Sequence, residues 1–429
     1  MSAFVINGGR RLNGSLSVQG SKNSVLPILA ATLLINGKSV IHNCPELSDT
    51  DCTVRILKEL GCRVNRSGST VTVENTANDI FEIPENLMRE MRSSVVFLGA
   101  ILGKCGKAVI SSPGGCEIGL RPIDLHLYAV RRLGVTVDDN YGKLTCEAVN
   151  GLKGAKITFS FPSVGATENA VLAAVKAKGT TTIVNCAREP EIIDLCDFLN
   201  ECGAKIKGAG ESIIVIEGVD TLIGCEHNVI CDRIAATTYL TAAAVTGGDV
   251  ELCNTIPHHL NSILPLLEES GCDLRVRCKS IRLKAPRRLS RIDKIITQPF
   301  PGFPTDAQAV FTALAAVADG TTVIVENIFE SRLKHVPELV RMGAKIRAEG
   351  RVAVVEGVER LYGADVFSPD LRGGAALVVA GLCANGETIV KNTRFIDRGY
   401  EDFENNLCML NADIYRKVKK DGRKEESKK

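Results

Sequence analysis

The stretch LKELGCRV at residues 57–64 decides the fold of this 429-residue chain, because five related stretches follow it. In each of them an apolar helical segment ends at a glycine or an asparagine, and a short strand begins. Gly and Asn tolerate the positive φ that ends a helix, so each stretch predicts a capped helix followed by a strand. The other five stretches are VRRLGVTV (130–137), LNECGAKI (199–206), LEESGCDL (267–274), VRMGAKI (340–346) and LCMLNADI (407–414). The capping residues Gly61, Gly134, Gly203, Gly271, Gly343 and Asn411 are 68 to 73 residues apart.

A second glycine lies 23 to 28 residues before each cap and opens a strand, as in NGKSVIHNC (36–44). After each of the first five caps comes a turn and another alternating strand, such as STVTVEN (69–75). Glycine-capped helices can recur by chance, but here two glycine positions keep their register in all six copies. Units this long do not suit a solenoid of short modules. We therefore predict an α/β protein of two pseudo-symmetric domains, each built from three repeated α/β units.

Composition excludes several classes of protein. The formal net charge is +2, aromatic residues make up 4% and Trp is absent, which argues against nucleic acid and membrane partners. The N-terminus lacks the apolar region of a secretory signal, and no stretch has the roughly 18 apolar residues of a membrane span. The 16 cysteines include no CxxC pair, so we expect reduced thiols, a cytoplasmic location and no metal site.

Two segments place reactive side chains on glycine-rich turns. In GSKNSVLPILAATLL (20–34), Lys22 precedes an apolar helix, where an anion would satisfy both the cation and the free N–H groups. The alternative is a surface lysine after a serine cap. In SSPGGCEIGLRPIDLH (111–126), Cys116 lies among glycines near Arg121, and a cation of that kind stabilises a thiolate. The alternative is a merely exposed thiol.

The second half of the chain contributes a carboxylate and three arginines. Asp306, in PFPGFPTDAQAVFTALAAV (299–317), either caps the helix that follows or points into a cleft as a proton acceptor. Arg332, Arg372 and Arg398 lie at helix-entry loops of the fifth and sixth units. Single arginines are usually solvated, but this set, with Lys22, Arg92 and Arg121, can surround a small polyanion. Residue types alone suit a phosphate-carboxylate substrate and do not name it.

Ten segments in order resemble the UDP-N-acetylglucosamine enolpyruvyl transferases, over nearly the whole chain. They are GSKNSVLPILAATLL, MRSSVVFLGA, PGGCEIGLRPIDLH, SVGATEN, AREPEIIDL, DRIAATTYL, FPTDAQA, FESR with HVPEL, DLRGGAAL and IDRGYE. The resemblance implies an inside-out α/β barrel in two domains, with the active site between them. The expected domains are residues 1–21 plus 230–416, carrying the Asp306 set, and 22–229, carrying the Cys116 loop, followed by a polar tail at 417–429. The related shikimate-type transferases lack the PGGC loop.

The resemblance also implies residue roles. The expected catalytic residues are Cys116, Asp306, Lys22 and Arg398. Phosphoenolpyruvate would be bound by Lys22, Asn23, Arg121 and Arg398 at its phosphate end and by Arg332 and Arg372 at its carboxylate. UDP-N-acetylglucosamine would be bound by Arg92, Arg121, Pro122, Ile123, Asp124, Leu125, Ser163, Val164, Gly165, Asp306 and Ile328. Cys116 would protonate C3 of the enol, and Asp306 would take the proton of the sugar 3′-hydroxyl.

The implied reaction opens peptidoglycan precursor synthesis, with phosphate released and no cofactor needed. Inhibition by epoxide phosphonates of the fosfomycin type is expected, because the loop carries Cys116. Phe161 is a departure, since many members have Lys two residues before the serine of the SVGAT segment. The alternatives are a shikimate-type transferase and an inactive paralogue that binds UDP-sugars.

Overall fold

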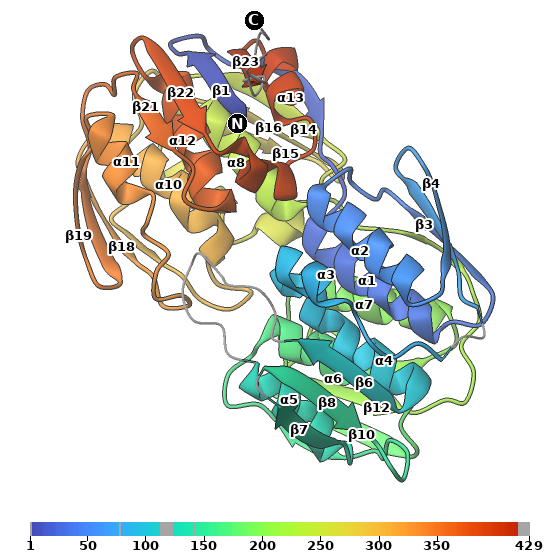
Figure 1. The fold of residues 1–429 in the computed structure, drawn as a ribbon. Coiled ribbons are helices and arrows are strands. Elements are labelled where there is room, and N and C mark those ends of the chain that lie inside the picture. Colours follow the sequence, from blue (N-terminus) through green and yellow to red (C-terminus); the bar gives the residue numbers. More distant parts are fainter. Residues whose placement is uncertain (1, 77–78, 112–122, 141, 419–429) are drawn as a thin grey trace, which may run out of the picture. The chain divides into compact units, whose positions relative to one another are not determined.

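The computed structural model describes residues 2–76, 79–111, 123–140 and 142–418 (Figure 1). The chain divides into two compact units, and we describe each by itself. Unit 1 comprises residues 1–18, 234–298 and 303–429, and unit 2 comprises residues 19–233 and 299–302. The chain therefore changes unit at 18/19 and 233/234 instead of 21/22 and 229/230. The sequence also did not indicate that Pro299–Gly302 groups with unit 2.

Each of the six repeats forms one sheet, so the predicted sixfold repetition is confirmed. In unit 2 the strand orders are β13(Glu226–Asn228)-β3(Lys38–His42)-β5(Thr70–Glu74)-β4(Arg63–Ser67), β6(Lys107–Ser111)-β8(Lys143–Glu147)-β7(Thr136–Asn140), and β11(Lys205–Lys207)-β12(Ile213–Glu217)-β10(Thr180–Val184)-β9(Lys156–Thr158). In unit 1 they are β15(Asp273–Val276)-β16(Ser280–Lys284)-β14(Asp249–Cys253)-β2(Asn13–Ser17), β17(Lys294–Ile296)-β18(Thr321–Val325)-β20(Val352–Glu356)-β19(Lys345–Glu349), and β21(Asp365–Phe367)-β22(Glu387–Lys391)-β1(Ser2–Asn7)-β23(Asp413–Val418).

Within each sheet one pattern recurs. The opening strand of the repeat and the strand after the helix cap both pair antiparallel with a central strand, as β3 and β4 do with β5. In five sheets a short fourth strand adds parallel to the opening strand, as β13 does to β3. In the second sheet, among the described residues, an isolated parallel bridge from Glu82 to Val109 takes that position. The repeated glycines thus mark equivalent points of one supersecondary unit.

The backbone explains the glycine spacing. All six predicted caps have positive φ, from 74° at Asn411 to 100° at Gly203. The second set of glycines is left-handed as well, for example Gly37 at 89° and Gly320 at 123°. Residues with a Cβ rarely adopt these angles, so the glycines end the helices and turn the chain into the strands.

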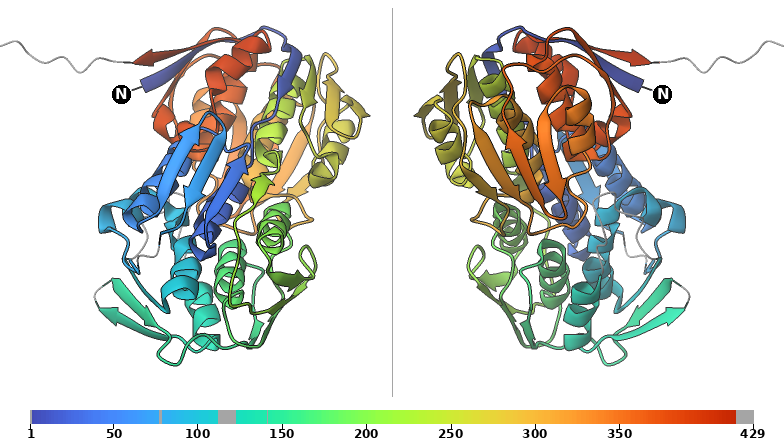
Figure 2. Two further views of the ribbon diagram at one scale, coloured as in Figure 1. Left: turned by 90° about the vertical axis from the view of Figure 1, so that its right-hand side faces the viewer. Right: turned by 90° about the vertical axis from the view of Figure 1, so that its left-hand side faces the viewer.

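The N-terminal strand completes the last repeat. The sixth cap, Asn411, is followed by a single strand, β23, and β1 takes the central place between β22 and β23 (Figures 1 and 2). Strand β2 similarly adds to β14 of the fourth repeat. The sequence pattern had shown a further strand only after the first five caps, and β1 supplies the missing one.

Three apolar helices form the centre of each unit. In unit 2 they are α1 (Lys22–Ala31), α4 (Phe97–Cys105) and α6 (Val164–Ala174), and in unit 1 they are α8 (Arg233–Val245), which begins at the unit boundary, α10 (Thr305–Val317) and α12 (Leu371–Cys383). Most of their residues are buried because they are rich in Ala, Leu, Val and Ile on all faces. The remaining helices and turns are η1 (Thr32–Leu34), α2 (Ser48–Glu59), α3 (Glu85–Glu90), η2 (Arg92–Val96), α5 (Asp124–Arg132), α7 (Pro190–Glu201), η3 (Pro257–Leu260), α9 (Leu264–Glu269), α11 (Val336–Arg341), η4 (Thr393–Arg398) and α13 (Phe403–Met409).

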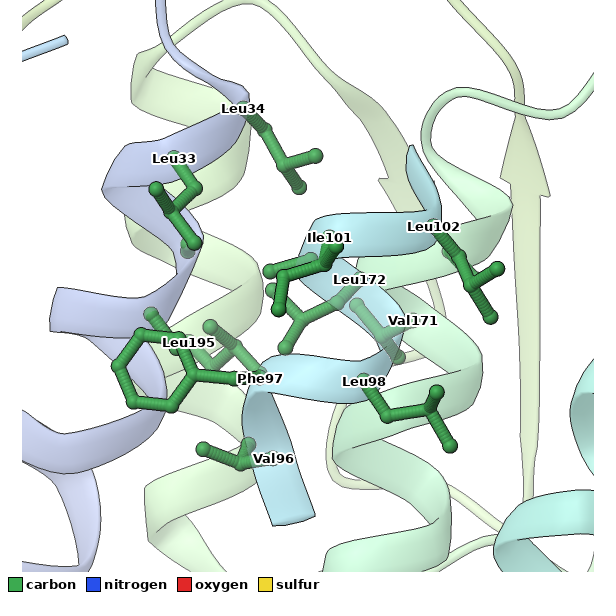
Figure 3. Close-up of a cluster of buried hydrophobic side chains, with 14 of the residues drawn as sticks. Leu33, Leu34, Val96, Phe97, Leu98, Ile101, Leu102, Val171, Leu172 and Leu195 are labelled. Atoms are coloured by element: carbon green, nitrogen blue, oxygen red, sulfur yellow. The ribbon is translucent and has the colours of Figure 1, made fainter. Parts of the chain in front are cut away.

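The core of unit 2 lies between its central helices. Phe97, Ile101 and Leu172 point toward one another from α4 and α6, with Leu195 of α7 beside them (Figure 3). All four side chains are fully buried. Among the described residues, no helix is long and apolar enough to cross a membrane.

Candidate active site

The predicted site residues fall into two sets, one in each unit. Most of those described lie at the start of a helix or of a 3₁₀ turn, because each central helix begins where its repeat enters the core. Asn23, Ile123 and Leu125 are half-buried, Asp124 is exposed, and Arg92 is the half-buried first residue of η2. Cys116, Arg121 and Pro122 lie outside the described residues.

Lys22 is the first residue of α1 and is only 6% exposed. Its Nζ lies 2.7 Å from Oδ2 of Asp49, which is also buried, in the first turn of α2. The interpretation of Lys22 as a surface lysine is therefore wrong. The ammonium of Lys22 is thus held in a buried ion pair at the start of α1.

A second segment of the chain holds the turn before Lys22. The N–H of Ser21 donates to the carbonyl of Ile230 at 2.7 Å, and the N–H of Asp232 donates to the carbonyl of Gln19 at 2.9 Å. The Asp232 carboxylate in turn accepts the backbone N–H of Lys22 at 3.2 Å. Because the turn is bonded on both sides, the position of Lys22 is defined by the backbone and not only by its side chain.

A network of buried polar side chains supports the same turn. Ser24, in the first turn of α1, donates its hydroxyl to Asp194 of α7. His227 of β13 lies between Asp194 at 3.0 Å and Glu201 at 2.7 Å. Burial acts to lower the pKa of His227, but the hydrogen bonds with the two carboxylates outweigh it and the pKa is raised. The sequence did not predict this network, because its residues look like ordinary polar residues of a helix and a strand.

Asn169 joins the three helix starts expected to bind the nucleotide sugar. It is fully buried, and its Oδ1 accepts the N–H of Gly99 in α4 at 2.6 Å. Its Nδ2 donates to the carbonyl of Val95 in η2 at 3.1 Å, and lies 2.8 Å from Nδ1 of His126 in α5. One amide thereby connects η2, α4 and α5 to α6. Asn169 is the last residue of the SVGATEN segment. Its place in that motif is the sequence signal that could have identified it as a site residue.

The start of α6 packs closely on α5. A Cβ at Gly165 would lie 2.9 Å from Cε1 of His126, so a larger residue would push α5 away. Ser163 caps α6 by accepting the N–H of Ala166 at 3.4 Å. The structure thus brings residues 163–165 and 123–126 together. Phe161, the departure noted above, is 42% exposed.

In unit 1, two buried arginines converge on Asp306. Nη2 of Arg332 lies 2.6 Å from Oδ1 of Asp306, and Nη2 of Arg372 lies 3.2 Å from Oδ2. The arginine side chains are 4% and 3% exposed, against 28% for Asp306. Asp306 is the second residue of α10 and Pro304 occupies the N-cap position, so the interpretation of Asp306 as the N-cap is wrong. The interpretation of these two arginines as solvated is wrong too.

Arg372 is held from two further directions. It is the second residue of α12, and not on the loop before the helix as expected; Asp370 caps that helix by accepting the N–H groups of Arg372 and Gly373. Its Nη1 donates to the hydroxyl of Tyr400 at 3.2 Å, and that hydroxyl lies 2.8 Å from Oγ1 of Thr238. Tyr400 follows Arg398, the half-buried last residue of η4, by two positions.

Glu326 positions the loop that carries Ile328. It is 1% exposed and accepts the N–H groups of Ile328 at 2.9 Å and of Phe329 at 3.0 Å. Its other oxygen accepts the Thr305 hydroxyl at 3.0 Å, at the start of α10. Asp306 and half-buried Ile328 are therefore parts of one bonded assembly. Glu326 was not predicted, because a carboxylate at the end of an apolar strand looks like an ordinary polar residue in the sequence.

A buried neutral histidine belongs to the same part of unit 1 as the two arginines. His335 is fully buried, and burial lowers its pKa to about 4, so the ring is neutral at pH 7. In the described structure, neither nitrogen of His335 has a hydrogen-bond partner, and Nε of Arg332 has none either. Two guanidiniums on one carboxylate, in a buried setting, can exchange part of that contact for the carboxylate of a ligand.

Most of the other cysteines are structural. Burial raises the pKa of Cys44 to about 12 and that of Cys146 to about 11, so both remain protonated thiols at pH 7. Among the described residues no group of three or more His, Cys, Asp and Glu is arranged to hold a metal ion.

Comparisons with known proteins agree with this architecture. Residues 6–407 match the family model of EPSP synthase (3-phosphoshikimate 1-carboxyvinyltransferase). The chain is 50% identical over 416 residues to UDP-N-acetylglucosamine 1-carboxyvinyltransferase 2 of Caldanaerobacter subterraneus subsp. tengcongensis, covering 97% of this chain and 100% of the relative. It is 48% identical over 418 residues to UDP-N-acetylglucosamine 1-carboxyvinyltransferase 1 of Symbiobacterium thermophilum, covering 96% and 95%.

Solved structures support the same assignment. The enolpyruvyl transferase NikO of Streptomyces tendae matches with a TM-score of 0.87 and 26% identity, over 97% of this chain and 98% of that one. EPSP synthase of Acinetobacter baumannii shares the fold, with a TM-score of 0.74 and 19% identity over 97% and 100%. The inside-out α/β fold of two three-repeat domains is thereby confirmed, and the chain belongs to the enolpyruvyl transferase family.

Proposed function

We propose that this protein transfers the enolpyruvyl group of phosphoenolpyruvate to the 3′-hydroxyl of UDP-N-acetylglucosamine and releases inorganic phosphate. The convergence of buried Arg332 and Arg372 on Asp306 is the observation that carries this proposal. It supplies, on one bonded assembly, a carboxylate able to accept a hydroxyl proton and two guanidiniums able to bind a substrate carboxylate. The names of the relatives that share about half of the sequence favour the UDP-sugar as acceptor.

The proposed chemistry is an addition followed by an elimination. Protonation of C3 of phosphoenolpyruvate by Cys116 makes C2 electrophilic. The sugar oxygen then bonds to C2 while Asp306 takes its proton. A C3 proton then returns to the Cys116 thiolate, the C2–O bond to phosphate breaks, and the enol ether and free phosphate result. Lys22, Asn23, Arg121 and Arg398 would bind the phosphate through these steps, because its charge must be stabilised as that bond breaks.

For the acceptor, we propose that the nucleotide part is bound by unit 2 and the sugar end by Asp306 and Ile328. The unit 2 residues are Arg92, Arg121, Pro122, Ile123, Asp124, Leu125, Ser163, Val164 and Gly165. The hydrogen bonds of Asn169, which connect three of these helix starts, support the grouping. The product would be a peptidoglycan precursor made in the cytoplasm, as the sequence resemblance implies.

A phosphate-release assay with both substrates tests the proposal. We expect release that depends on UDP-N-acetylglucosamine and not on shikimate 3-phosphate, which is the acceptor of the runner-up function. Release that occurs only with shikimate 3-phosphate as acceptor would establish the shikimate-type transferase. No release with either acceptor would favour a protein that binds UDP-sugars without turning them over.

The role of Cys116 has a separate test. An epoxide phosphonate of the fosfomycin type should alkylate the peptide that contains Cys116 and abolish turnover. A Cys116→Asp variant should resist the reagent, because a carboxylate is a weaker nucleophile than a thiolate. Full activity after prolonged treatment, with that peptide unmodified, would exclude Cys116 from the site.

A further inference from the structure

Two cysteine sulfurs of unit 2 are in contact. Sγ of Cys202 lies 3.3 Å from Sγ of Cys225. Cys202 directly follows α7, and Cys225 directly precedes β13. The two thiols therefore connect the helix of the third repeat with the strand that completes the first sheet.

The backbone holds both thiols where they are. The carbonyl of Cys202 accepts the N–H of Ile223 at 2.8 Å, and the carbonyl of Cys225 accepts the N–H of Val40 at 2.9 Å. Between them, Gly224 lies so close to the first sheet that a Cβ there would be 1.9 Å from the carbonyl oxygen of Lys38. A disulfide bond is about 2.05 Å long, so the two sulfurs have to approach each other by little more than about 1 Å.

The two thiols differ in access. Cys202 is 1% exposed, whereas Cys225 is partly exposed, so a dissolved oxidant reaches Cys225 first. Burial raises the pKa of both thiols, and their mutual hydrogen bond raises that of Cys202 further. Since the thiolate is the reactive form, oxidation is expected to be slow at neutral pH and faster as the pH rises.

We propose that Cys202 and Cys225 are a disulfide-forming site, oxidised by peroxides. The Cys225 thiolate attacks one peroxide oxygen, the O–O bond breaks, and a sulfenic acid and one water result. The Cys202 sulfur then bonds to the sulfenic sulfur and the S–OH bond breaks. The hydroxyl leaves with the thiol proton of Cys202 as a second water. Two thiols and one hydrogen peroxide thus give one disulfide and two waters, with both sulfurs oxidised and the peroxide reduced.

The cross-link would join the two elements that hold the turn of Lys22. Helix α7 carries Asp194, which accepts the Ser24 hydroxyl, and β13 carries His227, which is hydrogen-bonded to Asp194. A bond between their ends removes loop freedom from the unfolded chain, so unit 2 becomes more stable when oxidised. This inference does not depend on the proposed function.

The test uses the full-length protein treated with hydrogen peroxide at pH 8, followed by alkylation of free thiols and peptide mapping. We expect a cross-linked pair of peptides containing Cys202 and Cys225, lighter by two hydrogens than the reduced pair. The melting temperature should rise by a few degrees and return after dithiothreitol. Full alkylation of both cysteines after oxidation, or a disulfide from Cys225 to a different cysteine, would overturn the proposal.

Variants separate this pair from the other thiols. Cys202→Ser and Cys225→Ser should each lose the cross-link and the rise in melting temperature. Cys253→Ser, which removes an exposed thiol of unit 1, should keep both. If a variant fails to fold, the peptide map of the unmodified chain still decides the question. A rise in melting temperature that persists in Cys225→Ser would also contradict the assignment.

Discussion

Replacing Asp306 by Asn should strongly reduce turnover and at the same time tighten the binding of phosphoenolpyruvate. In the structure the Asp306 carboxylate occupies both Arg332 and Arg372 at 2.6 and 3.2 Å. A ligand carboxylate bound to the same guanidiniums must share them with a like charge. Comparing Asp306→Asn with the unsubstituted protein measures that competition directly, since the Asn side chain has nearly the same shape and no charge.

The size of the effect follows from the geometry. Two carboxylates on opposite sides of a guanidinium are about 6 Å apart, and at an effective dielectric constant of about 20 they repel by about 3 kcal/mol. If rearrangement and solvent remove half of this, about 1.4 kcal/mol remains, which is a tenfold change in Kd. Turnover should fall by about 10² to 10⁴, the usual contribution of a general base.

Isothermal titration calorimetry of phosphoenolpyruvate into the protein without UDP-sugar measures the binding. Asp293→Asn is the matched control, because it removes the same charge from an exposed ion pair with Arg291. We expect Kd to fall about tenfold only in Asp306→Asn. A Kd that is unchanged or higher in Asp306→Asn, with the control unaffected, would refute the assignment of Arg332 and Arg372 to the substrate carboxylate.

Four further outcomes are expected. Phe97→Ala should lower the free energy of unfolding by about 3 to 5 kcal/mol in urea titrations, because the ring is fully buried. Glu191→Gln should lower it by about 3 kcal/mol, because it removes the charge of a buried carboxylate that lies 3.0 Å from the Arg233 guanidinium. The pKa of His227 is raised in the folded protein, so protonated His227 contributes stability that is complete below its unfolded pKa of about 6.5. This stability is lost as the pH rises through the folded pKa. The free energy of unfolding should therefore fall over that pH range, and fall less in His227→Gln. Asn169→Ala should raise KM for UDP-N-acetylglucosamine more than it lowers kcat in the phosphate-release assay, since it loosens the helix starts proposed to bind the nucleotide.

Much of the fold could be predicted because its signal is local. Each cap needs one residue that tolerates positive φ, and six such residues at a regular spacing reveal the repeat. Pairing between strands that lie far apart along the chain produces no such local pattern in the sequence. Strands β1 and β2 pair with partners far along the chain, and the fourth strands, such as the three-residue β9 and β13, are too short to show an alternating pattern.

Some residues of the site could likewise be predicted from the sequence, and others could not. Lys22, Asp306 and the arginines could be assigned because they stand in motifs of a recognisable family. Their partners could not, because Asp49 and Glu326 look like ordinary polar residues of an amphipathic helix and a strand end. Only the packing shows that both carboxylates are buried, and burial is what makes each of them fix a neighbouring group.

The place of β1 has a consequence for synthesis on the ribosome. Residues 2–7 leave the ribosome long before β22 and β23, which flank them in the sheet. Nearly all of unit 2, whose main segment is the continuous stretch 19–233, can collapse while synthesis continues, whereas the sixth sheet has to wait for β22 and β23. Until then β1 is an unpaired apolar strand, and another chain can pair with it during synthesis.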